Sequence, residues 1–322
     1  MSHEVEIIDG QAQMAYAGEL PWHGLGTKVA SDLAPSQIMQ QAGLDWSVEK
    51  ETMTTASGVE IEGKKALVRS SDNKVLDVVG DNWNPVQNSE AFEFFSEYCL
   101  AGDMEMHTAG SLKGGQMVWA LAKVKESFDI LGGDQVDSYL LFSNPHKYGK
   151  AIDVRFTPIR VVCNNTLSMS LGQNVANSVS LNHRTAFNPE SVKQTMGIAH
   201  EKFAQYKETC EFLASKKFNM NSLIQYYNEI FPRTYQGKQE VNVKDYNDLT
   251  NNAQKAFSFL ETQPGAKFGE GSWWSALNSV TYLTDHKMGR EADSRLTSAW
   301  FGANQTRKVK AVEKAVEFAL AS

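Results

Sequence analysis

The sequence predicts an α+β fold, in which antiparallel β-hairpin groups flank one helix and an all-helical C-terminal part follows. Two observations indicate this class. Strand-like alternation broken by turn residues fills residues 45–79 and 104–157, with one helical pattern between them. Helical apolar spacing then recurs from residue 191 to the end. The 322 residues, 42% of them hydrophobic and 21% charged, exclude a disordered or rod-like chain and suffice for a substantial core.

By this pattern the chain divides into an irregular N-terminal segment over residues 1–44, an α+β core over 45–185 and a helical region over 186–322. The N-terminal segment contains the turn-rich stretch Pro21–Thr27, whose tryptophan either packs on its own chain or reaches a neighbouring subunit. A short helix is expected near residues 35–42.

The elements of the core follow one another at turn signals. A turn separates the expected strands Val59–Arg69 and Val75–Val79. Asn88 or Ser89 is expected to cap the following helix, and Gly102 is expected to end it. Two hairpins come next, built from strands expected at residues 104–112, 116–125, 138–143 and 151–157.

The helical region is expected to hold six helices, with Trp273 and Trp274 in a core or an interface. In the last helix, the apolar residues Val309, Val312, Val316 and Leu320 fall on one face, opposite lysines and glutamates. The expected helices lie at about residues 191–215, 222–231, 244–261, 272–288, 291–301 and 305–320.

Charge is distributed unevenly along the chain. The formal charge is −7, which excludes a generally basic coat for nucleic acid. Residues 1–150 hold 11 basic against 22 acidic residues, and residues 151–322 hold 20 against 16. Positive charge concentrates at residues 139–189 and 286–314. Such segregation is typical of a face that binds a polyanion, or of solvated helix faces paired with acidic neighbours.

The second hairpin of the core carries residue types that suit a single-stranded nucleic acid. Its tip places a tyrosine between two lysines, and the next strand alternates arginines with apolar residues. Cations bind phosphates while aromatic rings stack on bases, although both aromatic residues also suit a hairpin or a core. The predicted nucleic-acid-binding residues are Lys147, Tyr148, Lys150, Arg155, Phe156, Arg160 and Arg184.

Sequence signatures of catalysis and of metal binding are absent. The chain has no Walker phosphate loop, G-x-G-x-x-G, G-x-S-x-G or H-E-x-x-H motif, and no two of its seven histidines lie three or four residues apart. We therefore expect no metal and no cofactor. Cys163, with His183 twenty residues on, is a weak candidate for a nucleophile and its base. A small buried cysteine is the favoured interpretation.

Compartment follows from the cysteines and from apolar runs. Three scattered cysteines do not make a disulfide scaffold, no apolar run reaches membrane-spanning length, and no signal sequence is evident. The chain is expected in the cytoplasm, without membrane contact.

Several segments together resemble the phage/plasmid-like protein family, also catalogued as the domain of unknown function 932 family. The resemblance rests on Pro21–Thr27, Val78–Gly80, Asn84–Asn88 leading into Glu90–Phe92, and Arg160–Leu167. It implies a gene carried by phages, plasmids or prophage islands and a protein that works in a bacterial cytoplasm. The family has no assigned activity, so the resemblance implies no catalytic residue.

The layout is also similar to the core of phage single-strand annealing proteins of the RecT, Redβ and ERF kind, which form rings or filaments around a basic groove. Similarity of layout alone cannot assign a function. The leading hypothesis is a non-enzymatic, oligomeric protein that binds and anneals single-stranded DNA for recombination, without ATP or metal. Two alternatives stay open: an anti-defence protein that binds a host factor, for which the acidic half is suited, and a thiol-dependent enzyme that uses Cys163 and His183.

Overall fold

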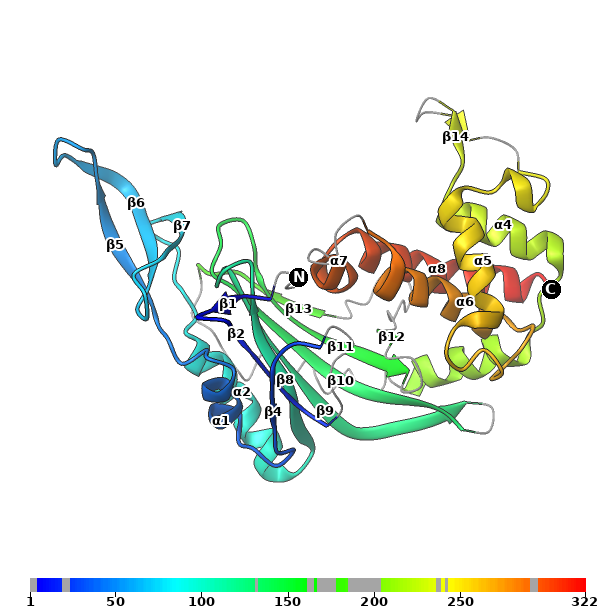
Figure 1. Ribbon diagram of the computed structural model, residues 1–322, viewed down its shortest axis with the longest axis horizontal. Coiled ribbons are helices and arrows are strands. Elements are labelled where there is room, and N and C mark those ends of the chain that lie inside the picture. Colours follow the sequence, from blue (N-terminus) through cyan, green and yellow to red (C-terminus); the bar gives the residue numbers. More distant parts are fainter. Residues whose placement is uncertain are drawn as a thin grey trace. The chain divides into compact units, whose positions relative to one another are not determined.

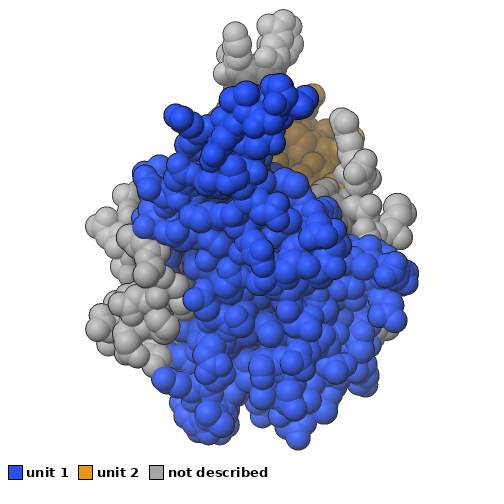
Figure 2. Space-filling model, turned by 90° about the vertical axis from the view of Figure 1, so that its left-hand side faces the viewer, with its two compact units in different colours: residues 1–125, 139–156, 178–198 blue, residues 126–138, 157–177, 199–322 orange. Residues whose placement is uncertain are grey.

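The computed structural model has the expected α+β class, with hairpin-rich sheets and a helical C-terminal part (Figure 1). The residues that it describes are 5–18, 24–130, 133–160, 165–166, 178–184, 204–235, 239–240, 243–289 and 295–322. The chain forms two compact units, coloured in Figure 2. Unit 1 comprises residues 1–125, 139–156 and 178–198, and unit 2 comprises residues 126–138, 157–177 and 199–322.

The N-terminal segment is more regular than its sequence indicates. It forms the strands β1 (Ile7–Ile8), β2 (Gln11–Ala12), β3 (Met14–Ala17) and β4 (Thr27–Val29), followed by helix α1 (Pro35–Gln41). All four residues of β3 are buried, and β3 pairs with β4 and with β8 of the large sheet. A strand of four buried residues shows no alternation, so its sequence carries no periodic signal. Pro21, Trp22 and His23 lie outside the described residues.

Within the described residues, the large sheet has eight strands and includes the expected hairpins. Its main path runs β12-β11-β10-β9-β8-β3-β4, and β13 also pairs with β11. The strands of this sheet not yet given bounds are β8 (Met104–Leu112), β9 (Met117–Ile130), β10 (Asp134–Pro145), β11 (Ile152–Arg160), β12 (Asn165–Thr166) and β13 (Ser178–Leu181).

A second sheet contains β5 (Val48–Thr54), β6 (Glu60–Arg69) and β7 (Val75–Gly80), and its β5–β6 hairpin projects from the rest of unit 1 (Figure 1). At its base, the buried Arg69 guanidinium donates from Nη1 to both carboxylate oxygens of Glu6 at 2.9 Å and from Nη2 to Asp72 Oδ2 at 2.6 Å. These charge-assisted hydrogen bonds fasten the sheet to the N-terminal segment.

Helix α2 (Asn88–Ala101) packs with α1 against β8, and its Phe94 and Phe95 rings contact Phe142 of β10. It ends at Gly102 as expected, because Gly102 takes the left-handed conformation with φ of 74°. Its N-cap is Gln87 rather than Asn88 or Ser89, since the Asn88 side chain is buried and bonds to other backbone groups.

Unit 2 is mainly helical. Residues 204–215 are helical, and residues 191–203 of the expected first helix lie outside the described part of the chain. Trp273 and Trp274 are fully buried, as expected. The remaining elements are α4 (Met220–Ile230), β14 (Thr234–Tyr235), β15 (Gln239–Glu240), the 3₁₀ helix η1 (Tyr246–Asp248), α5 (Asn251–Thr262), α6 (Trp273–Tyr282), the π-helical turn η2 (Leu283–Lys287), α7 (Arg295–Phe301) and α8 (Ala303–Leu320).

Helix α8 buries a different face from the one that its valines predicted. Leu320 is 71% exposed, and the buried residues are Asn304, Lys308, Ala311, Val312, Ala315 and Ala319. Small alanines let α8 approach α6 closely, and the Lys308 ammonium is neutralised by Asp285, whose Oδ1 lies 2.8 Å from Nζ. The sequence pattern missed this face because it counted only large apolar residues.

Candidate functional site

Four of the predicted nucleic-acid-binding residues lie at one end of unit 1. Lys147, Tyr148 and Lys150 are exposed in the loop that joins β10 to β11, and the Tyr148 side chain is 61% exposed. Leu181 of β13 pairs with Ile152 of β11, so the exposed Arg184 follows at the same end of the sheet. We call Lys147, Tyr148, Lys150 and Arg184 the basic tip.

The backbone of the basic tip is held while its side chains face solvent. The Tyr148 backbone N–H donates to Asp77 Oδ2 at 2.7 Å, which ties the loop to β7. The His146 N–H donates to the Gln116 carbonyl at 3.0 Å, and Lys147 Nζ donates to Gln116 Oε1 at 3.2 Å. The ring of Tyr148 is thus presented by an ordered loop, which lowers the entropy cost of binding a ligand.

The three predicted residues on β11 do not belong to this tip. Arg155 bonds to the neighbouring Asp153, with 2.5 Å between Nε and Oδ1, so its charge is largely compensated. Phe156 is 6% exposed and is therefore not accessible for stacking on a base. Arg160 ends β11 in unit 2, and its side chain lies outside the described part of the chain.

Three lysines of the basic stretch near the C-terminus pair with carboxylates of unit 2. Lys308 is buried against Asp285, and the Nζ atoms of Lys310 and Lys314 lie 3.8 and 3.7 Å from Glu229 Oε2. Because these lysines already have carboxylate partners, they are less available to a phosphate backbone than the lysines of the basic tip. The excess of basic residues in this stretch therefore overstates its free positive charge.

Buried polar side chains support the basic tip from inside unit 1. His146 precedes Lys147, and its Nε2 lies 3.0 Å from Asn88 Oδ1. His183 precedes Arg184, and its Nδ1 lies 3.1 Å from the Asn84 carbonyl oxygen. Asn144 Nδ2 donates to the Val86 carbonyl at 2.8 Å. We call Asn144, His146 and His183 the polar cluster, and all three are at most 2% exposed.

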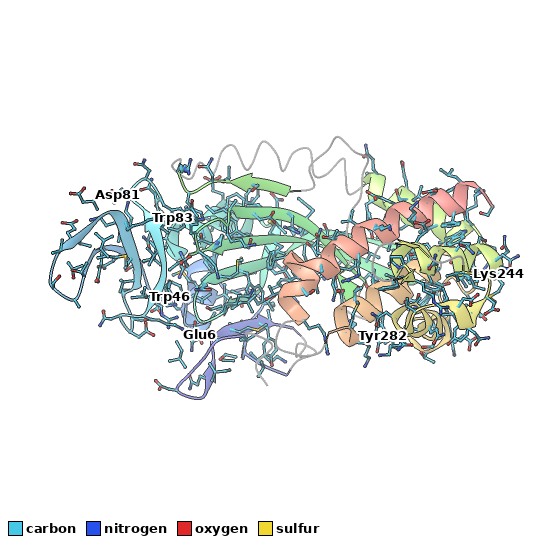
Figure 3. All side chains as sticks on the ribbon, turned by 90° about the horizontal axis from the view of Figure 1, so that it is seen from above. Glu6, Trp46, Asp81, Trp83, Lys244 and Tyr282 are labelled. Carbon is cyan, nitrogen blue, oxygen red and sulfur yellow. The ribbon has the colours of Figure 1, made fainter. Side chains whose placement is uncertain are left out.

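Two tryptophans cover these imidazoles, and both are labelled in Figure 3. The Trp83 and His183 rings stack with centroids 4.1 Å apart, and the Trp46 and His146 rings are tilted with centroids 5.3 Å apart. Burial, with a smaller electrostatic effect of His183, lowers the pKa of His146 to about 3. Burial also lowers the pKa of His183, against an opposing hydrogen bond to Asn84. Both imidazoles are therefore neutral near pH 7.

The structure describes only one member of the predicted pair of Cys163 and His183. Cys163 lies outside the described residues, and His183 is buried with its Nδ1 bonded to Asn84. Of the described cysteines, burial raises the pKa of Cys99 and strongly raises that of Cys210, so both stay as thiols. Among the described residues, no three or more His, Cys, Asp and Glu side chains gather as a metal site would require.

Sequence reasoning missed the polar cluster except for His183. Its hydrogen bonds join distant segments, such as His183 and Asn84, which are 99 residues apart, and no spacing rule joins such segments. One signal was present: the stretch Asn84–Asn88, noted for its resemblance and for a helix cap, supplies Asn84, Val86 and Asn88 as partners of the cluster.

Comparison with known proteins identifies a family for this chain. A family model described as "Domain of unknown function (DUF932)" matches residues 75–312. No curated protein and no solved structure matches the chain. Within the described residues, no helix combines the length and apolar character needed to span a bilayer.

Proposed function

We propose that this chain, which belongs to the domain of unknown function family DUF932, binds single-stranded DNA through the basic tip and anneals complementary strands as an oligomer. The setting that we propose is a phage- or plasmid-borne gene acting in a bacterial cytoplasm. Such a protein holds a strand extended, and base pairing itself supplies the free energy of annealing. The activity requires neither ATP nor a catalytic residue.

One observation carries this proposal: a largely exposed tyrosine ring lies between two exposed lysines on an ordered loop, with an exposed arginine at the same end of the sheet. An exposed ring stacks on an unpaired base, whereas the bases of a duplex already stack on one another. Lysine and arginine bind the flanking phosphates and release counterions, which makes the affinity dependent on salt. The arrangement therefore favours single strands without strong sequence preference.

The test is a charge reversal at the tip, Lys147→Glu with Lys150→Glu, measured by fluorescence anisotropy with a labelled oligonucleotide. We expect a large loss of single-strand affinity at low salt. The slope of log affinity against log salt should also fall by about 1.4 in magnitude, which is about 0.7 for each lost phosphate contact.

The matched control is Lys255→Glu with Lys267→Glu, which makes the same change of charge at two exposed lysines of unit 2. It should leave most of the affinity intact. Equal losses in both double variants would mean that net charge, and not the basic tip, determines binding.

A second candidate function is docking on a basic host protein, and the surface of α2 favours it. Leu100 on this helix is 87% exposed and would supply an apolar contact to such a partner. The neighbouring exposed acidic residues are Glu90, Glu93, Glu97, Asp103 and Glu105. This function predicts a host protein that co-purifies with the wild type and is lost with Leu100→Lys, while the DNA assay shows no binding.

A further inference from the structure

The basic tip is built on a turn of four residues, 147–150. The Lys150 N–H donates to the Lys147 carbonyl at 3.3 Å, and Gly149 takes φ of 73°, which some turn types require of their third residue. Tyr148 is the second residue of this turn. The hydrogen bond of the turn joins its first and fourth residues, so the Tyr148 N–H is left to bond with an acceptor elsewhere.

Asp77 of β7 supplies that acceptor. Its Oδ2 accepts from the Tyr148 N–H at 2.7 Å, and its Oδ1 accepts from the N–H of the next residue, Val78, at 2.8 Å. A carboxylate can accept at both oxygens, whereas the amide of an asparagine has only one acceptor oxygen. Satisfying both N–H groups at once therefore requires a carboxylate at residue 77.

A carboxylate at this place is unfavourable for attracting a phosphate. It lies within hydrogen-bond distance of the turn that carries Lys147 and Lys150, and its charge opposes theirs. A site formed for charge alone would not contain it. Its hydrogen bonds instead fix backbone groups, and a bond from an N–H to an ionised oxygen is about twice as strong as a neutral one. Residue 77 thus favours the geometry of the turn over its positive charge.

A second hold on the turn also rests on β7. The Gln116 carbonyl accepts from the His146 N–H at 3.0 Å, and Gln116 Oε1 accepts from Lys147 Nζ at 3.2 Å. Gln116 Nε2 in turn donates to the Leu76 carbonyl at 2.7 Å. Leu76 directly precedes Asp77. One short piece of β7 therefore supports both the lysine ammonium and the aromatic residue of the turn.

We propose that Asp77 is a positioning residue of the basic tip, a role that rests on the DNA-binding function proposed above. Its carboxylate holds the backbone from which the exposed Tyr148 ring projects, so the ring is placed to stack on an unpaired base before the strand arrives. A loop that is ordered before binding loses less entropy when a ligand binds. The lysines bind phosphates through long, flexible side chains and depend less on this bond. Asp77 therefore controls the contact with the base and not the contacts with the phosphates.

The test compares two labelled probes of equal length, a single-stranded oligonucleotide and an abasic strand that has the same phosphates without bases. Fluorescence anisotropy at low salt gives the affinity for each. Asp77→Ala should lower the affinity for the oligonucleotide by about fivefold or more, which is the lower end of what stacking on one base contributes. It should leave the affinity for the abasic strand unchanged or raised, because a negative charge has been removed. The ratio of the two affinities therefore falls.

The matched control is Asp81→Ala. Asp81, labelled in Figure 3, is exposed and directly follows β7. It bonds to Lys50 through its backbone carbonyl, which the substitution keeps. The control removes the same charge as Asp77→Ala and should leave the ratio of the two affinities as in the wild type.

A second comparison uses Tyr148→Ala, which removes the ring and keeps the N–H that Asp77 binds. This variant should itself lower the ratio, and Asp77→Ala should lower it no further in that background. An unchanged ratio in Asp77→Ala, or a further fall in the double variant, would overturn the role of Asp77 alone. A wild type that binds neither probe, or binds both equally, would overturn the proposed DNA-binding function and the role of Asp77 with it.

Discussion

At the scale of single residues, the two buried histidines keep their neutral form because burial penalises the imidazolium ion. They lie directly before Lys147 and Arg184, so their packing determines where the basic tip begins. A buried base of this kind couples the stability of the fold to pH.

We predict that the protein loses stability on acidification from pH 7 to pH 4.5. In the folded protein the pKa of His146 is about 3, below its ordinary value of 6.5, and that of His183 is also lowered. Between those values the unfolded chain binds protons that the folded chain does not, so stability falls as pH falls. His146 contributes roughly 1.4 kcal/mol per pH unit in this range, and His183 acts in the same direction.

Urea unfolding at several pH values measures this slope. His183→Phe should flatten it. The pKa of Asp72 is lowered to about 2 by its hydrogen bond with Arg69, so its contribution is lost only below about pH 4 and is separable. Stability that stays flat between pH 7 and pH 4.5 would contradict the neutral assignment of the histidines.

The buried ion pair of unit 2 gives a second prediction. Lys308→Met leaves the Asp285 carboxylate buried without its ammonium partner, and we expect a loss of about 3–5 kcal/mol in the free energy of unfolding. Lys310→Met on the same helix removes a half-exposed pair with Glu229 and should cost less than about 1 kcal/mol. Urea denaturation of both variants compares them directly, and similar losses would count against the role of Lys308.

At the scale of elements, the end of α2 depends on a single glycine. Gly102→Ala places a Cβ at a residue with φ of 74° and 3.2 Å from Lys125 Nζ, which can move away. We expect a loss of about 1–2 kcal/mol from the left-handed backbone alone. Gly80→Ala is the control, because Gly80 has no positive φ and a Cβ there meets nothing closer than 3.9 Å. Thermal unfolding that ranks the two variants equally would contradict this account.

The sequence predicted most elements of the core because the signals that set their boundaries lie within the elements or next to them. Turn residues and a helix-ending glycine set boundaries within a few residues, as in β8 and α2. What it could not predict depends on distant partners. Strand β3 is recognisable only from its pairing with β8, and the buried face of α8 only from Asp285 opposite Lys308. The polar cluster also depends on distant partners, because its hydrogen bonds join separate segments.

At the scale of the molecule, the free positive charge of a segment depends on which of its basic residues pair with carboxylates, and not on their number alone. In the stretch with the most basic residues, Lys308, Lys310 and Lys314 pair with Asp285 and Glu229, whereas the smaller basic tip is presented to solvent. On an acidic chain of net charge −7, binding of a polyanion then depends on a local site and is weakened by the overall field.

The most direct test of this account is fluorescence anisotropy of the wild-type protein with a single-stranded oligonucleotide and with its duplex, across a salt series. The account predicts tighter binding of the single strand and an affinity that falls steeply with salt. Equal affinity for duplex, or no binding at low salt, would contradict the proposed role of the basic tip. The second result would also favour the acidic face of α2 as the functional surface.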